Sequence, residues 1–151
     1  SSRPIVAIFD EPHASSDAGA ILLKAVDERL GLTAGIADCI YDSRRPASVR
    51  HEISELFRQR VFALACGYAD CSDAARLAHD PIQKLLVGRD PVQGDVLASQ
   101  PTLSRFENNV GPVTLYRMRS MHMDRLIQQH RRRLRRGDLR LSSRGGQRQE
   151  G

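Results

Sequence analysis

The spacing of apolar residues predicts helices along most of this chain. In the first predicted helix the apolar residues are spaced by three and four, at Ile21, Leu22, Ala25, Val26 and Leu30. Ser15, Ser16 and Asp17 can cap its start, and Gly31 ends it. A second, short helix is predicted from Ala34 to Tyr41.

The strongest helical pattern follows Ser48, which can serve as its N-cap. This helix ends near Gly67, and its apolar stripe consists of Ile53, Leu56, Phe57, Val61 and Leu64. A capped helix from Ala74 to His79 comes next, and Ile82 to Val87 forms a further helical turn or two. Two helices joined by a short glycine-containing turn and followed by a third have the outline of a helix-turn-helix.

The expected fold class is mainly α, with one short N-terminal strand, a helix-turn-helix-like segment over residues 48–87 and a disordered basic tail. The strand is predicted from the β-branched and aromatic run Ile5 to Phe9. Residues 88–101 contain glycines and prolines and are predicted to be irregular. Thr102 would cap the next helix, and a long amphipathic helix is expected from Val113 to about His130.

The basic excess of the chain lies at its C-terminal end. Residues 1–130 contain 15 Lys and Arg against 16 Asp and Glu, whereas residues 131–151 contain 8 Arg against 2 acids. The net charge of +5 is therefore the sum of −1 and +6. Because residues 137–151 are almost free of apolar side chains, the tail is expected to be disordered. The chain is therefore predicted to consist of two parts, a helical region over residues 1–130 and an Arg-rich tail over residues 131–151.

Basic side chains are the candidate DNA contacts. The strongest phosphate-binding cluster is in the tail and consists of Arg131, Arg132, Arg133, Arg135 and Arg136. A docked helix pair would add contacts from Arg58, Arg60, Arg76 and Lys84. A charged helix face is more often only solvated, so this second set is the weaker prediction.

Other candidate chemistry is limited. Asp10 and Glu11 could form a metal-binding pair, but neighbouring side chains on a strand point to opposite faces, and a solvated strand end is the preferred interpretation. His51 is interpreted as a surface histidine. The three cysteines offer neither a disulfide framework nor a complete set of zinc ligands. No secretory signal and no membrane-spanning run is recognised, so cytoplasm is the expected location and no membrane partner is expected.

Eight short segments stand in an order and spacing that match a known family. They are Phe9–Glu11, Asp17–Gly19, Glu28–Leu32, Ala65–Asp70, Asp73–Leu77, His79–Pro81, Gly94–Asp95 and Leu97–Asn108. In these segments the chain resembles the N-terminal region of bacterial insertion-sequence transposases, in the group whose catalytic part is called DDE domain group 1. The resemblance covers residues 5 to about 130, and its most specific parts are residues 67–81 and 97–108.

The resemblance implies a protein that binds the ends of a mobile DNA element and cuts and rejoins strands. It also implies an RNase H-like catalytic domain in which three carboxylates hold two Mg²⁺ ions. In the family, a strand with an Asp-x-Asp-like motif follows the long helix and supplies the first catalytic carboxylate. Here that position is occupied by Arg136 to Arg144, with Asp138 as its sole acid.

The sequence therefore predicts a truncated transposase fragment that binds DNA ends, lacks catalysis and holds no cofactor of its own. A reading-frame change would account for the abrupt Arg-rich tail. One alternative is a small non-enzymatic DNA-binding protein of the helix-turn-helix type. Another is a protein-interaction module that self-associates through the apolar side of residues 113–130.

Overall fold

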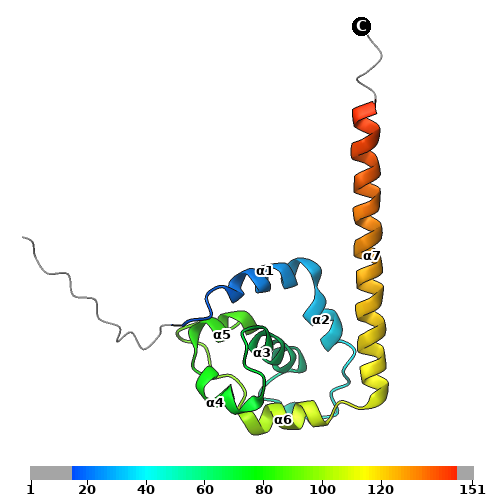
Figure 1. Ribbon diagram of the computed structural model, residues 1–151. Helices are drawn as coiled ribbons and strands as arrows, with labels where there is room; N and C mark the ends of the chain where they lie inside the picture. The colour runs from blue at the N-terminus through cyan, green and yellow to red at the C-terminus, as the bar shows by residue number, and fades with distance from the viewer. Residues whose placement is uncertain (1–14, 146–151) are drawn as a thin grey trace, which may run out of the picture. The chain divides into compact units, whose positions relative to one another are not determined.

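Helices account for the regular structure of the part of the chain that the computed structural model describes, which is the backbone of residues 15–145 and the side chains of residues 15–131. The α-helices are α1 (Ala20–Leu30), α2 (Leu32–Ala37), α3 (Ile53–Ala65), α4 (Ala74–Leu77), α5 (Pro81–Val87), α6 (Gln100–Asn108) and α7 (Pro112–Gly145) (Figure 1). Two single 3₁₀ turns, η1 (Pro46–Ser48) and η2 (Cys71–Asp73), complete the described elements. The mainly α prediction is confirmed, whereas the predicted strand at residues 5–9 lies outside the described residues. The chain divides into two units, residues 1–110 and residues 111–151.

The first two helices are separated by one glycine. Gly31 has a positive φ of 61° and donates its N–H to the carbonyl of Asp27, so it ends α1 as predicted. The Asp27 carboxylate accepts hydrogen bonds from both the backbone N–H (2.8 Å) and the hydroxyl of Thr33, which joins α1 to α2. Helix α2 starts earlier than predicted and ends at Ala37 rather than Tyr41.

Helix α3 lies against both α2 and α5. The predicted N-cap, Ser48, is wrong because this serine lies in η1; the cap is Glu52, which forms a capping box with Glu55. The buried face consists of Leu56, Gln59, Phe62 and Ala63. This face includes a glutamine and leaves Leu64 half exposed, so it is rotated from the predicted stripe.

Helix α5 is a core helix, with Gln83, Lys84, Leu86 and Val87 all buried. It begins at Pro81, and the Asp80 side chain caps it by accepting from the Gln83 N–H at 2.9 Å. Helix α4 is a single turn of four residues. The helix-turn-helix-like outline stays a prediction: after α3 come the 3₁₀ turn η2, the single turn of α4 with Arg76 exposed, and the buried helix α5.

Residues 88–99 contain no helix or strand, as predicted, and they carry the chain to α6. We call residues 94–99 the strap. Within it, Leu97 and Ala98 are buried, and the Leu97 N–H donates to the carbonyl of Ala78 at 3.1 Å. Helix α6 begins at Gln100 after Ser99 as N-cap, so the predicted cap at Thr102 is wrong by three residues.

Helix α7 is the longest element, with 34 residues. Of the residues predicted to form a disordered tail, 131–145 continue α7 without a break in the described backbone, and residues 146–151 lie outside the described residues. Arginine is a good helix former, and this segment contains no proline. Gly137 costs about 1 kcal/mol inside a helix relative to alanine, which is not enough to end it. No helix in the described part of the chain is both long and apolar enough to cross a membrane.

Candidate nucleic-acid interface

A buried glutamine on α3 holds the strap. The Gln59 side-chain amide donates to the Ala98 carbonyl at 2.9 Å and accepts from the Ala98 N–H at 3.0 Å. Ala98 is completely buried and Gln59 is 4% exposed, so water does not compete for either bond. This pair satisfies both backbone groups of a residue that is outside regular structure.

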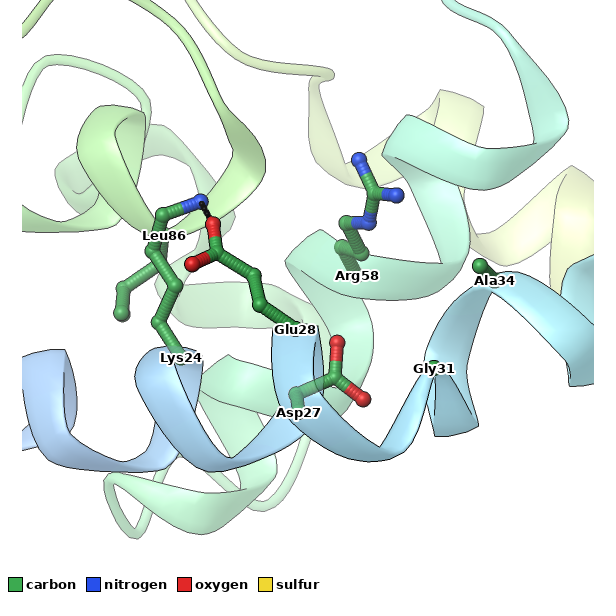
Figure 2. Close-up of a pocket in the computed structure, with 7 residues that line it drawn as sticks. All are labelled: Lys24, Asp27, Glu28, Gly31, Ala34, Arg58 and Leu86. Atoms are coloured by element: carbon green, nitrogen blue, oxygen red, sulfur yellow. Dashed lines mark ion pairs between the residues drawn. The ribbon is translucent and has the colours of Figure 1, made fainter.

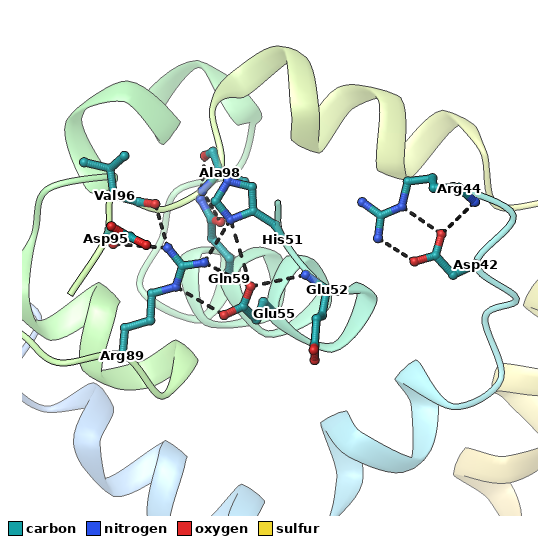
Figure 3. Close-up of polar contacts among 10 residues, drawn as sticks. All are labelled: Asp42, Arg44, His51, Glu52, Glu55, Gln59, Arg89, Asp95, Val96 and Ala98. Atoms are coloured by element: carbon teal, nitrogen blue, oxygen red, sulfur yellow. Dashed lines mark hydrogen bonds and ion pairs between the residues drawn. The ribbon is translucent and has the colours of Figure 1, made fainter. Parts of the chain in front are cut away.

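Arg89, which follows α5, also holds the strap (Figure 3). Its guanidinium donates to the carbonyls of Asp95 (3.1 Å) and Val96 (2.7 Å), and it pairs with the Glu55 carboxylate of α3 at 3.0 Å. The same guanidinium lies 3.0 Å from Nδ1 of His51. The strap is thus fixed by one charged side chain that connects three separate segments.

The His51–Glu55–Arg89 cluster shifts the pKa of two of its members. Burial lowers the pKa of His51, and the positive charge of Arg89 lowers it further. Burial opposes ionisation of Glu55, but the hydrogen bonds and charge of Arg89 outweigh it and hold the pKa of this carboxyl below its usual value. The interpretation of His51 as a surface histidine is wrong, since its side chain is 12% exposed.

Two of the predicted DNA-contact residues are engaged inside the first unit. Lys84 is buried, and its ammonium group donates to the carbonyl of Gly94 at 2.9 Å. The Arg60 side chain, 14% exposed, donates to the carbonyls of Tyr68 (3.2 Å) and Ala69 (2.8 Å) and pairs with Glu107 of α6. Both cations donate to backbone carbonyls of this unit.

Arg58, a third predicted contact, lines a cavity of about 250 Å³ between α1, α3 and α5 (Figure 2). Lys24 and Glu28 of α1 form an ion pair of 3.0 Å at the same cavity, and Asp27 also lines it. The cavity lining therefore carries two cations and two anions. This balanced charge does not favour a polyanion.

Arg76, the fourth, is on the surface of α4. Its side chain is 65% exposed, and its guanidinium lies over the ring of Tyr68 at 4.9 Å from the centroid. A loose ion pair of 3.4 Å joins it to Asp73. Of the four contacts predicted within the first unit, Arg76 is the one whose charged group faces solvent.

The densest run of basic residues in the sequence belongs to α7. The described arginines of this helix, Arg117, Arg119, Arg125 and Arg131, are all exposed. Arg132, Arg133, Arg135 and Arg136 continue the same helix, so the predicted tail cluster is placed on regular backbone. The residues of α7 include ten arginines and two aspartates, a net charge of +8, whereas residues 1–111 contain 12 cations and 15 acids, a net charge of −3.

Acidic groups in the described part of the chain do not gather into a metal site. No group of three or more His, Cys, Asp or Glu side chains among the described residues could hold a metal ion, so these residues do not fit the Mg²⁺ pair that the family resemblance implies. Asp10 and Glu11 lie outside the described residues. The three cysteines are free thiols.

A family model described as "Transposase DDE domain group 1" matches residues 1–136. This match places the chain among the transposases. More specifically, the chain belongs to the transposase DDE domain group 1 family, as the resemblance implied. No match was found among curated proteins or among solved structures.

The structure also identifies site residues that sequence reasoning missed. Arg89, Gln59 and Glu55 hold the strap that contains the start of the family-like segment Leu97–Asn108. Arg89 follows a glycine in an irregular segment, and Gln59 lies between two arginines of a helix, so no local pattern marks either residue. A buried position on the helical wheel of α3 was the one available signal for Gln59.

Proposed function

We propose that this chain is a truncated transposase fragment that binds the DNA ends of a mobile element and does not cut them. Family membership supports the transposase relationship and DNA as the partner. The exposed arginines of α7 are the single observation that carries the DNA-binding part of the proposal. The Mg²⁺ ions of the intact family have no role in this fragment.

The distribution of cations explains why α7 is the proposed contact. In the first unit, Lys84, Arg60 and Arg89 donate to backbone carbonyls, and the unit is net acidic. In α7, the four arginines whose side chains are described are exposed, and in its sequence the arginines outnumber the acids ten to two. Phosphate binding depends on such a local concentration of cations, because each neutralised phosphate releases condensed counterions.

The proposed lack of catalysis rests on residues 131–145. The family resemblance places a strand with an Asp-x-Asp-like motif here, whereas the described backbone is helical through Gly145 and Asp138 is the sole acid in residues 131–145. The fragment should therefore leave a supercoiled plasmid carrying the element uncut in the presence of Mg²⁺. Sequencing the coding DNA past codon 136 tests truncation separately. If no other reading frame encodes an acidic motif, the truncation hypothesis is wrong.

DNA binding is tested by fluorescence anisotropy of the full chain with a labelled duplex at several salt concentrations. In the test variant, glutamine replaces Arg131, Arg132, Arg133, Arg135 and Arg136. If all five contact phosphates, the slope of log K against log salt becomes less steep by about 4 to 5. The matched control places glutamine at five exposed arginines of the first unit, namely Arg29, Arg45, Arg50, Arg76 and Arg105. An unchanged slope in the test variant, or an equal change in the control, overturns the proposal.

Recognition of mobile-element ends is a separate part of the proposal. A duplex with the terminal inverted repeat that flanks the gene should bind at least tenfold more tightly than a scrambled duplex of the same length and composition. Equal affinity for the two duplexes refutes end recognition and leaves a sequence-independent phosphate binder. No affinity for either duplex refutes DNA binding altogether.

A further inference from the structure

Helix α7 exposes a row of large apolar side chains along one side. Val113 is 66% exposed, Tyr116 71%, Met123 48% and Ile127 45%, and two further exposed leucines, Leu115 (55%) and Leu126 (46%), lie beside this row. The residues of the row follow one another at steps of three, seven and four, which is the spacing of a row that repeats every 3.5 residues. Exposed apolar side chains at this period indicate a helix surface that packs against another helix.

The row fits a heptad repeat in which Val113, Ser120 and Ile127 occupy the a positions and Tyr116, Met123 and His130 the d positions. None of these six positions carries Asp, Glu, Lys or Arg, although 12 of the 34 residues of α7 do. β-branched residues at a positions together with leucine at d positions favour pairing of two parallel helices. Val113 and Ile127 meet the preference at a, whereas the d positions hold Tyr116, Met123 and His130.

The charges beside the row identify the partner as a second copy of this chain. Asp124 and Asp138 are the two acids of α7. Both fall at e positions, two heptads apart along the helix. Each of them follows an arginine at a g position by five residues, namely Arg119 and Arg133. In a parallel pair of identical helices, a g residue of one helix meets the e residue five positions later in the other.

We propose that two copies of this chain associate through α7 as a parallel, in-register pair of helices. Val113, Tyr116, Met123 and Ile127 of each copy form the shared apolar seam, and Arg119 of one copy pairs with Asp124 of the other. This inference goes beyond the proposed function, because the association requires no DNA. Arg131 to Arg136 of the two copies come close together at one end. Their repulsion weakens the pair at low salt and is screened as salt rises.

The seam is tested by sedimentation equilibrium of the full chain without DNA. The wild-type chain should dimerise, and its dissociation constant should fall as salt is raised from 50 to roughly 500 mM because the arginine repulsion is screened. Ile127→Lys should weaken the dimer at least tenfold. Gln128→Lys adds the same charge at the neighbouring b position and should change the constant less than twofold. Circular dichroism of both variants shows whether α7 keeps its helical content.

The parallel orientation of the two helices is tested by exchanging the charges of Arg119 and Asp124. Asp124→Arg should weaken the dimer, and adding Arg119→Asp should restore it, because the exchanged pair meets again in a parallel helix pair. In an antiparallel pair, e positions meet e positions, so the second substitution restores nothing. A monomer at every concentration, equal effects at Ile127 and Gln128, or no restoration by the double exchange overturns the proposal.

Discussion

Gln59→Leu should release the strap of residues 94–99 from α3. Leucine has nearly the volume of glutamine and leaves the apolar packing of α3 in place, but it can neither accept from the Ala98 N–H nor donate to the Ala98 carbonyl. Both of those bonds are buried. The substitution therefore isolates the polar contribution of one side chain to the position of the strap.

The expected loss follows from the burial of Ala98. Each backbone group left without a partner costs about 1–3 kcal/mol, and Ala98 is completely buried, so two groups together cost about 2–6 kcal/mol. For a unit of about 100 residues, 1 kcal/mol shifts Tm by about 4–8 °C. A fall in Tm of at least roughly 8 °C is therefore expected.

This loss of stability is measured by urea and thermal unfolding with circular dichroism as the signal. Hydrogen exchange of the Ala98 amide shows directly whether the strap has been released. Gln100→Leu is the matched control, because Gln100 is exposed and bonds to Ser104 at the surface. The control should change the free energy of unfolding by less than about 0.5 kcal/mol. Equal stability of the two variants, with unchanged exchange at Ala98, would refute the reasoning.

Two further predictions concern the same region. Because burial and then Arg89 lower the pKa of His51, the unfolded chain takes up the proton first as pH falls below about 6.5, and stability falls by up to about 1.4 kcal/mol per pH unit. The pKa of Glu55 is also lowered, so stability falls further once the pH drops below the usual pKa of a glutamate. His51→Gln should remove the loss of stability caused by His51 when unfolding is measured at pH 7.5 and 5.5. Gly94→Ala should destabilise the chain by about 1–3 kcal/mol, since the new Cβ would collide with the Asp90 carbonyl. Gly111→Ala, where nothing lies within 4 Å of the new Cβ, should change the melting temperature little.

Local patterns predicted the helices well because helix formation depends on residues a few positions apart. Gly31 ends α1 through its positive φ, which glycine adopts without a steric cost, and residues 88–99 are irregular where glycines and prolines cluster. Cap positions were predicted less well. Ser48 and Thr102 are good capping residues, but the helices begin where Glu52 and Ser99 cap them. Several residues near a helix start can cap it, and tertiary packing selects among them.

The candidate site was predicted only in part, because the use of a cation depends on contacts far away in sequence. Arg60 pairs with Glu107, 47 residues later, and Arg89 pairs with Glu55, 34 residues earlier. Neither contact leaves a mark on neighbouring residues. The cluster from Arg131 to Arg136 was singled out because its arginines form a nearly continuous block, whereas the exposed Arg117, Arg119 and Arg125 were missed. The helical backbone of the cluster was missed, because the absence of apolar residues was given more weight than the helix propensity of arginine.

The unbroken helical backbone of α7 also sets the length of DNA duplex that this helix can span. A helix of 34 residues measures about 51 Å, at 1.5 Å for each residue. The same distance along a DNA duplex corresponds to about 15 base pairs, at 3.4 Å for each pair. A shortened α7 would reach proportionally fewer base pairs. The length of duplex that the chain protects from nuclease digestion should therefore change with the number of helical residues, even when the number of arginines is held constant.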